Sequence, residues 1–207
     1  MFLYSHSSPA SPLRAILVSL LAFWLPLTGV RANEAVTVQA AASSPTFTGI
    51  LDLLYRQKYN EAITQLERVL EKNSANGDAL TYMATANLYR ELNFMKAMKE
   101  FETAFKFGGG ATFFVSHSHE RFSTGDVVDY CRGWLHLRAG GVDFVAIDGT
   151  HSFKSTYNEV QEFKTNRLSK RVFHIKVGEK NQNFRGRSNS ESEPLLIIAL
   201  YKKFARN

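Results

Sequence analysis

Hydrophobic residues in the first half of the chain recur at intervals of three and four positions, the spacing of one helix face. Ile63, Leu66 and Val69 form such a face. Asn60 and Asn93 stand at the starts of two of these segments, where an asparagine side chain can accept hydrogen bonds from free helix amides. The pattern predicts four helices, near residues 45–56, 60–72, 78–91 and 94–107.

The hydrophobic spacing changes to alternate positions in the second half, which is typical of half-buried strands. Gly140-Gly141 and Asp148-Gly149 mark tight turns between neighbouring segments. The pattern predicts seven short strands, over residues 112–116, 134–137, 142–147, 152–156, 160–165, 171–177 and 182–185. Short strands at regular spacing predict an antiparallel sandwich or barrel, so the expected fold class is α+β.

A strongly apolar segment near the end of the sequence predicts a helix. Pro194 opens it, and Leu196 and Leu200 belong to a set that spreads over more than one face and cannot all meet water. A seven-stranded barrel leaves one end open, and one apolar helix over residues 195–205 is the right size to fill it. We therefore expect a barrel-like domain over residues 112–207 that includes its own C-terminal helix.

Three consecutive glycines, Gly108-Gly109-Gly110, separate the two halves. Glycine just past a helix can adopt the left-handed conformation that ends it, and a run of glycines predicts a hinge over residues 108–111. Glycines that cradle phosphate instead precede a helix and are followed by Lys or Ser/Thr, whereas a strand follows here. The pattern favours a hinge between a helical module over residues 45–107 and the sheet domain.

Residues 1–32 have the layout of a secretory signal peptide. A basic residue precedes an apolar run, Pro26 breaks the run, and Val30-Arg31-Ala32 supplies small residues for cleavage. The alternative is a retained membrane anchor over residues 13–30, which is at the short end for crossing a bilayer. Pro26 and the cleavage-like site favour removal. We therefore expect export to the periplasm or the extracellular space, with residues 33–44 as a flexible linker.

The helical half also repeats itself. Four positions recur 35 residues later with similar side chains: Tyr59, Ala62, Leu66 and Val69 are followed by Phe94, Ala97, Phe101 and Ala104. In "LLYRQKYNEAITQLERVLEKNSAN" and "NLYRELNFMKAMKEFETAF" the chain resembles the tetratricopeptide repeat family, over about two repeats within residues 47–107. It departs from that family at Lys58 and Asn93, where glycine is usual. The resemblance implies a protein-binding scaffold, with a partner contacting Tyr55, Tyr59, Tyr82, Tyr89 and Phe94.

The strand half resembles the pleckstrin-homology-like superfold and its bacterial GRAM-type relatives over residues 112–205. The residues that carry this resemblance are "CRGWLHLRAGGVDFVAIDGTHSF", "FHIKVGEKNQNF" and "EPLLIIALYKKF". The resemblance implies binding to proteins or to anionic lipid head groups. Lipid-binding members carry several Lys or Arg around the loop between the first two strands. Here that loop, Ser118–Asp129, offers Arg121 and His119 against three acidic residues, so the phosphoinositide site is not reproduced.

The net charge of +6 is unevenly distributed. Residues 108–207 hold 15 basic and 10 acidic residues, whereas residues 33–107 hold 8 and 9. The densest basic set consists of Arg167, Lys170, Arg171, Lys180, Arg185 and Arg187. Strand turns can gather several of these at one rim, which would attract an anionic surface; the alternative is an ordinary solvated face. Nucleic acid is not expected as a partner, because export separates the chain from it and no binding motif is present.

Histidine and cysteine residues are the remaining candidates for chemistry. His117 and His119 alternate as in a strand and so point to one side, but a zinc site needs three or four ligands. The other candidates, Cys131, His136, His151 and His174, show no ligand spacing. We expect an exposed histidine pair and no metal-binding, cofactor-binding or catalytic residue. A lone cysteine is more often a small core residue than a nucleophile, and its inability to form an internal disulfide fits a bacterial envelope protein.

These patterns predict an exported protein that is not an enzyme. The leading function is protein–protein interaction, with the helical hairpins of residues 45–107 as the docking surface. The alternative is binding of an anionic ligand or a membrane surface through the basic rim of the sheet domain. Salt distinguishes the two, because binding through the rim should weaken steeply between low and moderate ionic strength.

Overall fold

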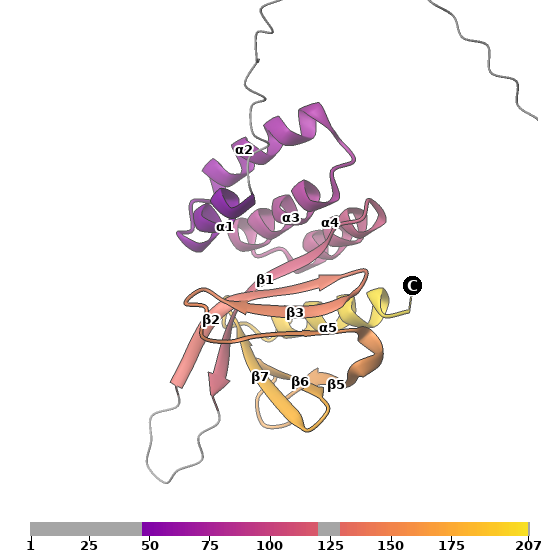
Figure 1. Cartoon of the computed structure of the whole chain (residues 1–207). Coiled ribbons are helices and arrows are strands. Elements are labelled where there is room, and N and C mark those ends of the chain that lie inside the picture. Colours follow the sequence, from indigo (N-terminus) through magenta and orange to yellow (C-terminus); the bar gives the residue numbers. More distant parts are fainter. Residues whose placement is uncertain (1–46, 120–128, 207) are drawn as a thin grey trace, which may run out of the picture. The chain divides into compact units, whose positions relative to one another are not determined.

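Figure 1 shows a computed structural model of the chain, which describes residues 47–119 and 129–206. The expected signal peptide and linker, residues 1–44, lie outside these ranges. The helices are α1 (Phe47–Tyr55), α2 (Tyr59–Lys72), α3 (Gly77–Glu91), α4 (Phe94–Lys106) and α5 (Ser192–Phe204). The strands are β1 (Gly110–His119), β2 (Asp129–Arg138), β3 (Gly141–Ala146), β4 (Ser152–Ser155), β5 (Val160–Thr165), β6 (Val172–Val177) and β7 (Lys180–Gly186). A single-turn 3₁₀ helix, η1 (Tyr157–Glu159), precedes β5.

The seven strands form one antiparallel sheet in the order β4-β3-β2-β1-β7-β6-β5. The edges of this open sheet are β4 and β5. Helix α5 contacts β2, β5 and β7 and so lies inside the bend of the sheet (Figure 1). The predicted class is confirmed: α+β, with helices first, then a seven-stranded antiparallel sheet, then a C-terminal helix.

Strands β1 and β2 are longer than the alternation alone predicted. They pair over ten residues each, from Gly110↔Arg138 to His119↔Asp129. The prediction ended β1 at residue 116 because the polar residues beyond it mask the apolar alternation. Pairing with β2 and β7, which a sequence does not display, carries the strand further.

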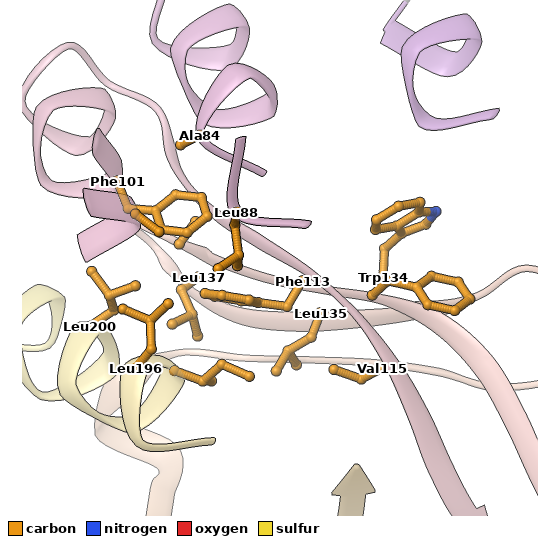
Figure 2. Close-up of a cluster of buried hydrophobic side chains, with 14 of the residues drawn as sticks. Ala84, Leu88, Phe101, Phe113, Val115, Trp134, Leu135, Leu137, Leu196 and Leu200 are labelled. Atoms are coloured by element: carbon orange, nitrogen blue, oxygen red, sulfur yellow. The ribbon is translucent and has the colours of Figure 1, made fainter. Parts of the chain in front are cut away.

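Both faces of β1 are buried, because residues of α1 and α3 meet one face and residues of α4 and α5 meet the other. Phe114 contacts Trp134 on the neighbouring strand, with ring centroids 5.2 Å apart, on the face that also meets Tyr55 of α1. On the opposite face, Phe113 lies between Phe101 of α4 and the residues of α5 (Figure 2). A strand buried on two faces explains the near-continuous apolar run at this point of the sequence.

The glycine segment between α4 and β1 packs tightly against α3. A Cβ at Gly109 would collide with the backbone carbonyl of Gly77. The amide of Gly110 donates to the hydroxyl of Thr81 at 2.8 Å, and Thr85 donates to the Thr112 carbonyl at 2.9 Å. The structure thus places the segment predicted as a hinge at a close crossing of α3 and β1. Ser43–Asn207 forms one compact unit.

Asparagine side chains begin two of the helices. Asn76 accepts from the amide of Ala79 at 2.9 Å, and Asn93 accepts from the amide of Lys96 at 3.0 Å. The predicted cap at Asn93 is confirmed. The predicted cap at Asn60 is wrong, because α2 already begins one residue earlier and Asn60 lies within its first turn.

Candidate functional site

Large apolar side chains are exposed where α3 turns into α4 and where α5 begins. Leu92 is 53% exposed, Met95 74% and Leu195 53%. Leu92 ends α3 in the left-handed conformation, with φ of 52°, and its amide bonds back to the Leu88 carbonyl. Glycine normally occupies such a position. A leucine in this conformation carries backbone strain. Its apolar side chain is also exposed to water, so the position invites a functional explanation.

These residues line an open groove of about 690 Å³. Its apolar lining comes from Leu92, Phe94, Met95, Met98, Leu195 and Leu196. The last two belong to α5, so the groove is built by segments about a hundred residues apart in the chain. Methionine is flexible and polarisable, which suits a surface that adapts to the shape of a bound side chain.

Charged residues form the polar rim beside this groove. Glu91 pairs with Arg90 at 2.7 Å and with Lys96 at 2.9 Å. Hydrogen bonds from Arg90 and Lys96 lower the pKa of Glu91, so it remains ionised. An apolar floor with a paired, charged rim is the usual anatomy of a protein-binding surface.

The aromatic residues predicted to contact a partner divide into two groups. Tyr55 is 40% exposed, and Tyr59 and Phe94 are half-buried. Tyr82 and Tyr89 are buried, so a partner-binding role does not fit their positions. The ring of Tyr82 packs on Phe47, and the hydroxyl of Tyr89 donates to Glu193 at 2.8 Å. Within the set, Phe94 alone lines the groove.

The predicted basic set does not gather at one rim. Arg167, Lys170 and Arg171 are exposed in the β5–β6 connection, and Arg185 lies near them because it pairs with Val172. Lys180 pairs with Val177 at the opposite end of β6.

Arg187 does not fit the predicted anionic site. Its guanidinium donates to the Leu54 and Tyr55 carbonyls at 3.2 and 3.3 Å and lies 4.8 Å from the centroid of the Phe114 ring. Arg187 therefore ties the end of β7 to α1. No local pattern predicts these contacts, because they join residues more than 130 positions apart.

The histidine pair differs from its prediction. His117 is buried, and His119 is half-buried rather than exposed. The Nδ1 atom of His117 lies 3.6 Å from the sulfur of Cys131. Burial, followed by the nearby His119 and His151, lowers the pKa of His117 to about 4. Within the described ranges, His117, His119 and Cys131 form the one group of three or more His, Cys, Asp or Glu residues whose donor atoms lie close enough to share a metal ion.

Two further histidines, His136 and His174, lie apart from this group. His136 is buried, with Nδ1 2.9 Å from the hydroxyl of Thr112. His174 pairs with Glu162 at 3.0 Å. Hydrogen bonds from Lys164 and then His174 lower the pKa of Glu162 to about 2.

Comparisons with known proteins find similarity of fold only. No family model matches the chain, and no curated protein matches it. One similar solved structure is the C-terminal domain of an unknown protein from Leishmania infantum, with 10% identity, a TM-score of 0.34, and coverage of 44% of this chain and 81% of that one. The N-terminal PH domain of human ARAP2 has 7% identity, a TM-score of 0.35, and coverage of 46% and 77%. The PH domain from TgAPH has 15% identity, a TM-score of 0.34, and coverage of 55% and 95%.

Two of these three structures are PH domains, the superfold that residues 112–205 resemble in sequence pattern. At these identities and TM-scores the likeness assigns no family and no ligand. In the residues that the structure describes, helices are too short or too polar to cross a bilayer.

Proposed function

We propose that this protein is a non-enzymatic binding protein that holds a partner protein in the groove between the α3–α4 turn and α5. The observation that carries the proposal is the exposure of Leu92, Met95 and Leu195 around one hollow. Exposed apolar patches with polar rims typically mark interaction sites on soluble proteins.

The shape and chemistry of the groove favour an amphipathic helix as the partner element. Such a helix lays an apolar face with anchors three or four positions apart into a hydrophobic groove. The Glu91–Lys96 rim offers both signs of charge to the polar flanks of that helix. Apolar anchors supply most of the affinity, and the rim sets the orientation.

The experiment is affinity capture from an envelope extract with three variants of the full chain. Met95→Glu and Leu195→Glu each place a charge in the groove, and both should lose a partner that the wild type captures. Leu168→Glu is the matched control, because Leu168 is 96% exposed in the β5–β6 connection. If mass spectrometry finds equal capture of the partner by the wild type and all three variants, the groove does not bind that partner.

A second candidate function is binding of an anionic surface through the β5–β6 connection. Three exposed cations, Arg167, Lys170 and Arg171, lie in this short connection with Arg185 beside them. Neutralising the three to glutamine should abolish sedimentation with anionic vesicles and leave groove binding intact. Lys180→Gln at the other end of β6 is the control. Binding that persists unchanged at moderate salt would contradict this candidate.

We infer export from the pattern of residues 1–32. A basic residue, an apolar run and a small-residue boundary at Val30-Arg31-Ala32 support it. Cleavage there leaves Asn33 as the first residue of the mature chain. N-terminal sequencing of the native protein checks this, and finding Met1 or Phe2 instead would contradict it.

A further inference from the structure

Three potential metal ligands meet at one end of the β1–β2 pair. His117 and Cys131 are direct cross-strand partners, so their side chains lie on the same face of the sheet. His119 follows two residues later on β1 and points to that face as well. The nitrogen and sulfur donor atoms of these three residues all lie within 4.8 Å of one another.

The spacing of the donors matches a tetrahedral metal ion. Zinc binds cysteine sulfur at about 2.3 Å and histidine nitrogen at about 2.0–2.1 Å, so tetrahedral angles place the two donors about 3.6 Å apart. The observed separation of the Cys131 sulfur and the His117 Nδ1 is 3.6 Å. These two ligands thus already stand at the distance that a shared zinc ion requires.

A fourth ligand is close by, on a different hairpin. His151 follows the β3–β4 turn, and its ring centroid lies 4.0 Å from that of His119 and 6.1 Å from that of His117. The turn is held by Asp148, which accepts from the amide of Thr150 at 3.0 Å. His151 is exposed and can turn toward an ion without disturbing the core.

Surrounding residues fix the buried ligand. The side chain of Gln182 on β7 hydrogen-bonds to His117. The ring of His117 also packs on Phe144 and Phe184, with centroids 5.5 and 5.0 Å away. A polar residue behind a ligating histidine orients the ring and raises its affinity for metal. One thiolate with two or three imidazoles selects zinc and similar transition metals over magnesium or calcium.

We propose that His117, His119 and Cys131 bind a zinc ion, with His151 as the fourth ligand. The site joins three hairpin segments, because β1, β2 and the β3–β4 turn each supply a ligand. It lies apart from the groove proposed for partner binding, which is formed by helices α3, α4 and α5. Zinc binding is therefore a separate function of the sheet, and partner binding in the groove does not depend on it.

The test titrates the full chain with Zn²⁺ by calorimetry and with Co²⁺ by absorption spectroscopy. The wild type should bind one ion, and the cobalt form should show a thiolate-to-metal charge-transfer band. Cys131→Ser should abolish that band, and His119→Ala should weaken zinc binding by at least about 10-fold. Zinc should also raise the melting temperature of the wild type, because it binds the folded chain. His174→Ala is the control, since His174 lies outside the site and should leave binding unchanged.

Absence of binding by the wild type would overturn the proposal. So would equal zinc affinity in the wild type, Cys131→Ser and His119→Ala, since the ion would then bind elsewhere. If Cys131→Ser fails to fold, His119→Ala carries the same comparison, because His119 is only half-buried. An unchanged affinity in His151→Ala would give the fourth position to water and overturn the role assigned to that residue.

Discussion

Buried polar side chains join the helices to the sheet at defined points. Glu193, at the start of α5, accepts hydrogen bonds from the hydroxyl of Tyr89 at 2.8 Å and from the amide of Ser188 at 2.7 Å. Burial raises the pKa of Glu193, and these donors offset part of the cost of burying the carboxyl group. Across the described part of the chain, every buried side-chain nitrogen and oxygen has a hydrogen-bond partner. These buried hydrogen bonds favour one arrangement of the helices on the sheet.

His136 gives the folded chain a dependence on pH. Burial, followed by the nearby positive charge of Arg138, lowers its pKa to about 4 from an ordinary value of 6.5. Between those values the unfolded chain binds a proton that the folded chain does not, so stability is lost as the pH falls. This histidine alone should lower the free energy of unfolding by about 2 kcal/mol between pH 7 and pH 5.

Urea unfolding of the wild type and of His136→Gln at both pH values checks this prediction. The variant should lose roughly that part of the difference, because glutamine does not titrate. A variant whose stability falls between pH 7 and pH 5 as steeply as that of the wild type would show that His136 is not responsible.

At the scale of elements, the crossing of α3 and β1 depends on residues that have no side chain. Gly77 of α3 and Gly109 before β1 lie so close that a Cβ at either one would collide with backbone atoms of the other segment. The hydroxyl of Thr81 bridges them, since it accepts from the Gly110 amide and donates to the Gly77 carbonyl at 2.8 Å. The glycine run thus allows α3 and the start of β1 to pack closely.

Gly109→Ala should therefore destabilise the protein by about 1–3 kcal/mol, because the added methyl group forces α3 and β1 apart. Gly140→Ala is the matched control, since no atom lies within 4 Å of a Cβ built there. Thermal unfolding measures both. Equal melting temperatures for the two variants would mean that the crossing is looser than the structure shows.

At the scale of the whole molecule, helices and sheet share one hydrophobic core. A continuous cluster of buried residues runs from Ile50 in α1 through Phe113 in β1 to Leu200 and Phe204 in α5. Phe204 also stacks on Phe105 of α4, with ring centroids 3.9 Å apart. The C-terminal helix therefore packs against both the helices and the sheet.

Leu200→Ala should destabilise helices and sheet together, by about 2–5 kcal/mol, because it opens a cavity at their shared centre. Circular dichroism follows helix content, and tryptophan fluorescence follows the surroundings of Trp134 in β2. Both signals should report one coincident transition in the wild type and in the variant. Two separate transitions would indicate that the helices and the sheet unfold independently. Leu168→Ala, at a fully solvated site, is the control and should be nearly neutral.

Local patterns in the sequence were enough to predict the helices, seven strands and the apolar C-terminal helix. Helix and strand periodicity depend on residues a few positions apart, and so does the cap at Asn93. The α+β class follows from the order of these elements. The same local patterns predicted too short a β1 and a helix cap at Asn60. Both predictions are wrong because strand pairing and helix packing, which involve distant residues, set the ends of β1 and α2.

Only the tertiary structure decided which side chains of the two candidate sites lie together. Pairing of β1 with β2 brings Cys131 opposite His117, although the two show no ligand spacing in sequence. Packing of α5 beside the α3–α4 turn brings Leu195 next to Met95 to form the groove. Tyr89 looked like a binding residue and is buried. Contacts between residues that are distant in the chain depend on strand register and helix docking, which the energy of the whole fold selects.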